Sequence, residues 1–263
     1  LLFFPFFFFS PSSSFLSSSA SSVLFFSFSS LLLLLLLLFL QIVDALLDVL
    51  LQPKLGSLAS EVLYARKCIQ YVLVKILGKL MGENGRIETV RALLRQVSTL
   101  LESANEANKA NAQPTSVLVC ALETVAELVG IIGSPIMSVY ETLLPPLLSA
   151  TLHPSPSARL SAAHCLRSLT QTIPGRACFL TNQCLDRLKK FRSSPDAIHG
   201  SGFAAAAVVA GSASCTLGLP TEVAGTVLSM SEELIRTVPA AAQASFPTAL
   251  ACCEAGWALA GPS

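Results

Sequence analysis

From residue 41 onward, apolar residues recur at three- and four-residue steps, and this spacing constrains the fold more than any other feature of the sequence. It matches one face of an α-helix. No segment in this part of the chain alternates with the two-residue period of a half-buried strand flanked by turn residues. We therefore predict an all-α protein, with helices over 41–52, 58–81, 86–107, 115–132, 136–152, 156–173, 177–192, 196–216, 221–238 and 243–260.

Helix-breaking residues separate the predicted helices. Pro53 ends the first, Pro135 lies near the start of the fifth, and Pro239 ends the ninth. A polar stretch near 105–114 (NEANKANAQP) indicates a linker. The connections are short, so successive helices are expected to pack side by side.

The width of the apolar faces predicts how these helices pack. In the helix over 58–81, Leu73, Val74 and Leu77 widen the stripe that Ile69, Val72 and Ile76 begin. A helix that is apolar over more than half of its circumference must be covered on two sides. Stacked antiparallel helix pairs provide that cover, so we expect an α-solenoid rather than a single four-helix bundle.

The segment Tyr140–Ile173 (YETLLPPLLSATLHPSPSARLSAAHCLRSLTQTI) resembles a HEAT repeat, which is a pair of helices of about 40 residues. Small alanines in its second helix allow neighbouring helices to approach closely. Arg159 lies in a first helical turn, where the helix dipole disfavours cations. The resemblance implies that Arg159 instead pairs with a neighbouring repeat. The residues that match the repeat are Pro146, Leu147, Leu148, Arg159, Ala162, Ala163 and Leu166.

Residues 1–38 differ from the rest of the chain in composition. Every Asp, Glu, Lys and Arg lies at or after Asp44, whereas residues 1–43 contain 11 of the 15 phenylalanines. Three interpretations of this Phe/Ser/Leu leader are open: a low-complexity tract outside the fold, a buried helix near Leu31–Leu50, or a membrane span. The uncharged stretch from Val23 to Val43 is long enough to cross a bilayer, but no basic residue precedes it.

From residue 39 to 263 the chain resembles the HEAT repeat-containing protein 5 family. Segments in the family's order include EVLYARKCIQYVLVKILGKLMGE, SPDAIHG, CTLGLP and EAGWALAG. Solenoid packing does not require SPDAIHG (194–200) or CTLGLP (215–220), so these segments are the more specific ones. The family consists of very long cytosolic helical-repeat proteins, of which this chain would be a fragment.

The resemblance implies a role as an accessory factor in clathrin-associated vesicle traffic between endosomes and the trans-Golgi network, through endocytosis and retrograde transport. It implies protein partners of the aftiphilin and gamma-synergin type. The expected location is cytoplasmic, and peripheral at the trans-Golgi network, endosomes and clathrin-coated vesicles. Membrane association would then be indirect.

The sequence contains no motif that indicates an enzyme or a cofactor. The eight cysteines form no Cys-x-x-Cys pair and, with the three histidines, no spacing typical of a zinc site. We expect them to be buried, reduced thiols, as in the cytosol. His164 and Cys165 are neighbours on a helix, so they cannot act as a base and a nucleophile together. Glu123 and Glu127 are one turn apart, a spacing typical of a solvated surface.

One basic cluster stands near the end of the helix over 177–192. There it complements the helix dipole, or it binds an acidic peptide or an anionic surface. The net charge of +1 argues against a general nucleic-acid binder. The alternatives to a trafficking scaffold are a membrane-anchored helical protein and a nuclear-transport-like repeat protein. The cluster, as a candidate partner-binding site, consists of Arg187, Lys189, Lys190 and Arg192.

Overall fold

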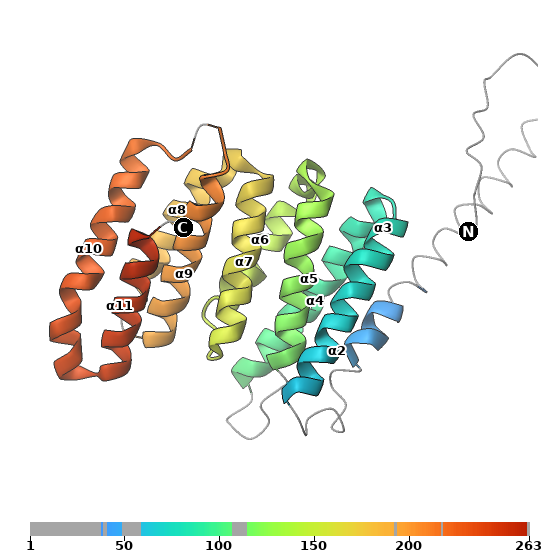
Figure 1. Ribbon diagram of the computed structural model, residues 1–263, viewed down its shortest axis with the longest axis horizontal. Coiled ribbons are helices and arrows are strands. Elements are labelled where there is room, and N and C mark those ends of the chain that lie inside the picture. Colours follow the sequence, from blue (N-terminus) through green and yellow to red (C-terminus); the bar gives the residue numbers. More distant parts are fainter. Residues whose placement is uncertain are drawn as a thin grey trace, which may run out of the picture. The chain divides into compact units, whose positions relative to one another are not determined.

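The computed structural model in Figure 1 describes residues 38, 41–48, 59–106, 115–191, 194–216 and 218–261. All regular secondary structure in these ranges is helical, which confirms the all-α prediction. The chain divides into two compact units, Leu1–Gln41 and Ile42–Ser263, and the helices described below belong to the second. Residues 1–37 of the predicted leader and residues 107–114 of the predicted linker lie outside the described ranges.

The helices follow the predicted order closely. Residues 41–48 are helical, and the run predicted over 58–81 contains a π-helical stretch in its middle. Two 3-10 turns precede α6 and α8. The elements are α2 (Ala59–Tyr71), η2 (Val72–Leu77), α3 (Gly78–Leu80), α4 (Glu83–Glu106), α5 (Thr115–Ile132), η3 (Ser134–Val139), α6 (Tyr140–Ala150), α7 (Pro156–Thr172), η4 (Pro174–Arg176), α8 (Ala177–Lys190), α9 (Pro195–Ser212), α10 (Thr221–Ala244) and α11 (Phe246–Ala260).

Serine followed by proline sets the start of two helices. Ser155 and Ser194 have extended backbones, and each precedes a proline in the first turn of α7 or α9. Proline disfavours a helical conformation in the residue before it, yet its own fixed φ suits the first position of a helix. These two boundaries therefore lie within a residue of their predicted places.

The prediction that Pro239 ends a helix is wrong. Pro239 lies inside α10, which continues to Ala244. The residue is exposed, so water can hydrate the carbonyl group that loses its hydrogen-bond donor. Three alanines, the residue type with the highest helix propensity, follow directly and continue the helix.

The helices of the second unit lie in two layers (Figure 1). In the first layer α2, α5, α7, α9 and α11 follow one another, and each contacts the next. In the second layer α4 contacts α6 and α8 contacts α10, while a hydrogen bond of 2.8 Å from Arg187 Nη2 to Leu148 O links α8 to α6. Across the layers, α4 packs on α5, α6 on α7, α8 on α9 and α10 on α11.

Helix α5 is a central helix of this core. It contacts α2 and α4 on one side and α7 on the other, and twelve of its eighteen residues are buried. Among the described helices, α5 alone is long and apolar enough to cross a membrane, but 67% of that segment is buried inside the fold. The composition of α5 is thus accounted for by its place between neighbouring helices.

Helix α9 approaches its neighbours very closely at two glycines. A Cβ atom built on Gly200 would lie 1.7 Å from the carbonyl oxygen of Thr151, just after α6. A Cβ atom on Gly202 would lie 2.4 Å from Cβ of Ala255 in α11. Glycine at both positions lets the backbone of α9 contact the chain on both sides.

Candidate partner-binding cleft

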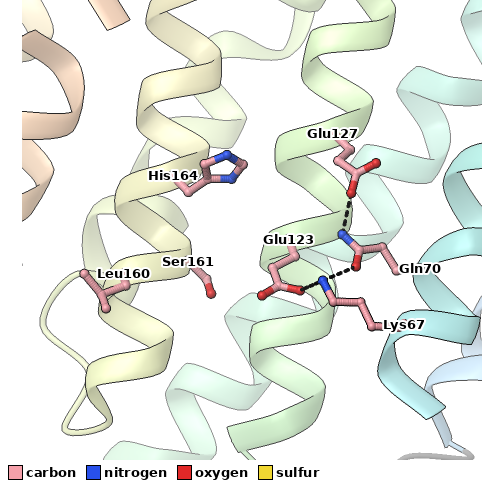
Figure 2. Close-up of a pocket in the computed structure, with 7 residues that line it drawn as sticks. All are labelled: Lys67, Gln70, Glu123, Glu127, Leu160, Ser161 and His164. Atoms are coloured by element: carbon pink, nitrogen blue, oxygen red, sulfur yellow. Dashed lines mark hydrogen bonds and ion pairs between the residues drawn. The ribbon is translucent and has the colours of Figure 1, made fainter. Parts of the chain in front are cut away.

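An open cleft of about 380 Å³ lies on the first layer, where α2, α5 and α7 meet (Figure 2). In α2 and α5 the lining residues are three or four positions apart, and in α7 His164 is three positions from Ser161 and four from Leu160, so each set lies on one side of its helix. The lining residues are Lys67 and Gln70 from α2, Glu123 and Glu127 from α5, and Leu160, Ser161 and His164 from α7.

Glu123 of α5 lies between two basic residues of α2. Its Oε1 is 3.7 Å from Nη2 of Arg66, and its Oε2 is 3.6 Å from Nζ of Lys67. Both separations exceed the usual N–H···O hydrogen-bond range of about 2.7–3.2 Å. Oε2 is buried and accepts no hydrogen bond from any described residue. Each carboxylate oxygen of Glu123 therefore has an electrostatic partner on α2, at a distance longer than a hydrogen bond.

Glu127, one turn further along α5, is more completely paired. Gln70 donates a 2.6 Å hydrogen bond from Nε2 to Glu127 Oε1, and Lys75 Nζ lies 3.7 Å from Oε2. Gln70 in turn accepts a 3.1 Å hydrogen bond from Lys67 Nζ (Figure 2). Glu123 and Glu127 are partly exposed, as the i, i+4 spacing predicted, but the spacing gave no sign of the basic residues of the preceding helix that pair with them.

The α7 wall of the cleft is formed by two polar residues and a leucine. Ser161 is only 8% exposed, and within the described ranges its hydroxyl is not one of the buried side-chain groups that lack a hydrogen-bond partner. Figure 2 shows Ser161 and the exposed His164 directed from α7 toward α5. Leu160, 45% exposed, forms the apolar part of this wall. We did not predict Leu160 or Ser161 as site residues, since nothing in the sequence marks them.

His164 and Cys165 point to different surroundings, as predicted. His164 lines the cleft, whereas Cys165 is fully buried and its thiol donates a 2.8 Å hydrogen bond to Leu122 O in α5. Burial raises the pKa of the Cys165 thiol, which keeps it protonated. The pair is not a base and nucleophile.

Arg159 of the repeat motif pairs with another helix, as expected from the resemblance. Its Nη1 lies 2.7 Å from Asp196 Oδ1 in α9 and donates to the carbonyl oxygens of His153 and Pro154 at 3.0 and 2.9 Å. Its Nε donates a 3.2 Å hydrogen bond to Nδ1 of His199. The side chain is 5% exposed, so Arg159 is a structural link between α7 and α9 rather than a binding residue.

The other residues of the repeat motif pack in the core or beside it. Pro146 lies inside α6 as expected and is half-buried. The remaining five are buried: Leu147, Leu148, Ala162, Ala163 and Leu166.

The residues of the predicted basic cluster differ in how buried they are and in what they contact. Arg187 is half-buried, and its Nη2 donates a hydrogen bond to Leu148 O. Its Cζ atom lies 5.6 Å from the centre of the Phe191 ring. It therefore links α8 to α6 rather than presenting a free charge. Lys189 and Lys190 are exposed, with Lys190 Nζ 5.5 Å from the Phe191 ring centre, and Arg192 lies outside the described residues.

Pairs of polar side chains link neighbouring helices at three places in the first layer. Glu123 and Glu127 join α2 to α5, Arg159 and Asp196 join α7 to α9, and His199 Nε2 lies 3.5 Å from Glu254 Oε2 between α9 and α11. Between α5 and α7 no ion pair joins residues that the structure describes. The cleft opens at this junction.

The α5 and α7 walls of the cleft carry carboxylate, hydroxyl and imidazole groups, which can accept hydrogen bonds. Within the described ranges, no group of three or more His, Cys, Asp or Glu residues is arranged to hold a metal ion. All eight cysteines are free thiols. No protein-family model matches the chain, and no solved structure is significantly similar to it.

Proposed function

We propose that this protein is a non-catalytic scaffold of the HEAT/armadillo-like kind, an α-solenoid of stacked antiparallel helix pairs that binds a protein partner on its first layer. One observation carries the proposal: four successive helix pairs, α4 with α5 through α10 with α11, each contact the next pair through the first layer. Stacks of this kind bury their core between repeats and leave long surfaces for partner segments.

Polar contacts between the pairs support the same arrangement. Arg159 and Asp196 link the pair α6–α7 to α8–α9, and His199 and Glu254 link α8–α9 to α10–α11. A single bundle would instead place most helices around one shared core. In this chain α5 and α11, for example, pack on different neighbours.

The cellular part of the proposal rests on the resemblance to the HEAT repeat-containing protein 5 family. On this proposal the protein acts in clathrin-associated traffic between endosomes and the trans-Golgi network, as a peripheral cytoplasmic factor. Its partners are of the aftiphilin and gamma-synergin type. The cleft between α5 and α7 is the surface we propose for docking, because it is open and is lined by polar side chains of α5 and α7 beside the exposed Leu160.

Small-angle X-ray scattering of the full chain tests the architecture. A compact globule of this length has a radius of gyration of about 18 Å. A solenoid has a larger value and a skewed distance distribution, so a symmetric distribution near ~18 Å contradicts the stacked arrangement.

A binding measurement tests the function. We expect purified aftiphilin or gamma-synergin to bind the full chain saturably, and Ser161→Trp, which fills the cleft, to weaken that binding at least tenfold. Cys68→Trp, at an exposed position of α2 outside the cleft lining, is the matched control. Binding that is equally strong in both variants contradicts docking at the cleft.

A further inference from the structure

The pair α10–α11 carries an exposed apolar face at one end of the two layers (Figure 1). Helix α11 packs chiefly on α9 and α10, and two of its aromatic residues, Phe246 and Trp257, are 73% and 66% exposed. A large apolar patch on a protein surface marks an interaction site. The end face, as we call this patch, consists of Leu228 and Ile235 from α10 and of Phe246, Leu250 and Trp257 from α11.

The α11 part of the end face points away from the neighbouring helix of its layer. Ala255 of α11 faces α9, because its Cβ lies only 2.4 Å from the position of a Cβ atom built on Gly202. Successive residues of an α-helix are rotated by about 100°. This rotation places Phe246, Leu250 and Trp257 on the side of α11 opposite Ala255. The end face therefore lies where a further helix would pack against the first layer.

The exposed residues of α11 are arranged symmetrically along the helix. Phe246 and Trp257 are equally far from the midpoint of their row, and so are Leu250 and the half-buried Cys253 between them. A two-fold axis through that midpoint, perpendicular to α11, would place the helix antiparallel to a second copy of itself. Phe246 would then meet Trp257 of the second copy, and Leu250 would meet Cys253. An interface between two identical surfaces requires this kind of self-complementarity.

Charge does not oppose such a pairing. Glu254 is the only charged residue of α11, and its Oε2 lies 3.5 Å from Nε2 of His199 in α9, away from the row. On α10, Arg236 next to Ile235 forms an ion pair with Glu232. Like charges that face each other across an interface repel, whereas α11 brings no such charge to the end face. An uncharged, apolar partner surface fits it best.

The apolar area is enough for a weak, specific dimer. The end face offers roughly 500 Å² of apolar surface per copy, at about 100 Å² for a fully buried aliphatic side chain and about 200 Å² for an aromatic one. Two copies would together bury about 1,000 Å², the lower limit for a specific interface. We therefore expect a dissociation constant in the micromolar range.

We propose that the end face binds a second copy of this chain, with α11 of one copy packed antiparallel on α11 of the other about a two-fold axis. The end face is separate from the α5–α7 cleft, so this inference goes beyond the docking function proposed above. In the dimer each copy presents its own cleft.

Sedimentation equilibrium of the full chain in reducing buffer tests the proposal. We expect the wild-type chain to dimerise and Trp257→Glu to weaken the dimer about a hundredfold or more, because the two-fold axis repeats the altered contact. Tyr71→Glu is the matched control, since Tyr71 of α2 is an aromatic residue that is 61% exposed. It should leave the dissociation constant unchanged. Both positions are exposed, so both variants should fold, and thermal unfolding checks this.

A mixing experiment tests the antiparallel register. In a homodimer of Phe246→Lys or of Trp257→Glu, both aromatic contacts would contain a charged residue, so each variant alone should be monomeric. In a mixture of the two variants, the new lysine of one faces the new glutamate of the other, and the remaining Trp257 faces the remaining Phe246. We expect this heterodimer to form at least tenfold more tightly than either homodimer, and no gain on mixing contradicts the register.

Three other results overturn the proposal. A wild-type chain that stays monomeric at about 100 μM leaves the end face to another occupant, such as a further helix pair. A dimer that Trp257→Glu does not weaken uses a different surface. If Tyr71→Glu weakens association as much as Trp257→Glu does, the copies join head to tail and the two-fold pairing is wrong. The docking function is tested at the cleft and is independent of all these results.

Discussion

Nη1 of Arg159 in α7 lies 2.7 Å from Oδ1 of Asp196 in α9, and the same nitrogen donates to two backbone carbonyl oxygens in the turn before α7. The guanidinium side chain is 5% exposed, while that of Asp196 is 48% exposed. The two partners are thus unequal: the arginine is buried and satisfies several acceptors, whereas water can hydrate the aspartate.

Replacing the two partners should therefore have unequal costs. We expect Arg159→Ala to lower the free energy of unfolding by about 2–3 kcal/mol, because it leaves acceptors unpaired in a buried turn. Asp196→Asn should cost less than about 1 kcal/mol, since the pair is half-exposed on that side. Urea unfolding at about pH 7.5 measures both. Arg167→Ala, at an exposed position of the same helix, is the control, and an equal cost for Arg159→Ala and Arg167→Ala would contradict the structural role.

The stability of the fold should fall at acidic pH. Burial and the neighbouring Arg159 guanidinium lower the pKa of His199 below its ordinary value, although Glu254 and Asp196 act in the opposite direction. The pKa of His153 is lowered by the same two causes, burial first. The unfolded chain therefore takes up these protons at a higher pH than the folded chain, so acid favours unfolding.

We expect the midpoint temperature of unfolding to be highest above the ordinary histidine pKa of about 6.5 and to decrease as the pH falls through that value toward the lowered one. His199→Gln should reduce this decrease, whatever its effect on stability at pH 8. Differential scanning fluorimetry between pH 8 and pH 5 measures the slopes, and identical slopes in wild type and His199→Gln would count against the prediction.

The contact between Gly200 and Thr151 predicts a strong effect of adding one methyl group. In Gly200→Ala the new Cβ would lie 1.7 Å from the Thr151 carbonyl oxygen and 2.9 Å from Cδ of Arg159. Backbone must move to accept it, so we expect a loss of about 3 kcal/mol or more, at or above the usual cost of overpacking. Gly225→Ala in α10 is the matched control.

A methyl group added at Gly225 would meet no atom within 4 Å beyond the backbone of its own helix, so alanine there should raise stability by about 0.5–1 kcal/mol through its helix propensity. Chemical denaturation of the two variants side by side makes the comparison. A Gly200→Ala protein as stable as Gly225→Ala would show that α9 does not approach Thr151 this closely.

The cysteines should differ widely in reactivity. Cys68 is exposed, whereas Cys120, Cys165 and Cys184 are buried. Burial raises the pKa of Cys120 to about 11 and also raises that of Cys165 and Cys184, so these thiols carry little thiolate at pH 8. We expect Cys68 to react first with a disulfide reagent and these three only after unfolding in urea. Cys68→Ser should remove the fastest phase, and rapid reaction of Cys165 in the folded chain would contradict the buried core.

Local patterns predicted the helices well where a boundary is set by neighbouring residues. The Ser-Pro dipeptides at the starts of α7 and α9 restrict the backbone locally, and the first residue of each helix was predicted to within one position. The prediction for Pro239 failed because the effect of a proline depends on its surroundings: an exposed proline followed by alanines can remain inside a helix. The pairing of Arg159 with another helix was expected from the resemblance, but its partner was not.

The candidate cleft was not predictable in the same way. Glu123 and Glu127 have the spacing of a solvated helix face, and Ser161 is an ordinary serine in an alanine-rich helix. Their role depends on what the adjacent helices place opposite them. Arg66 and Lys67 of α2 supply cations on one side of Glu123, and α7 supplies none to the cleft on the other.

The sequence by itself determined that the chain is helical, where most helices begin and end, and which residues face a core, because these properties depend on periodicity and on backbone restrictions within a few residues. Only the tertiary structure decided which buried polar groups have partners, such as Arg159, and which have none among the described residues, such as the hydroxyl of Ser201. Periodicity assigns a residue to a face of its own helix, but the groups opposite that face come from distant parts of the chain.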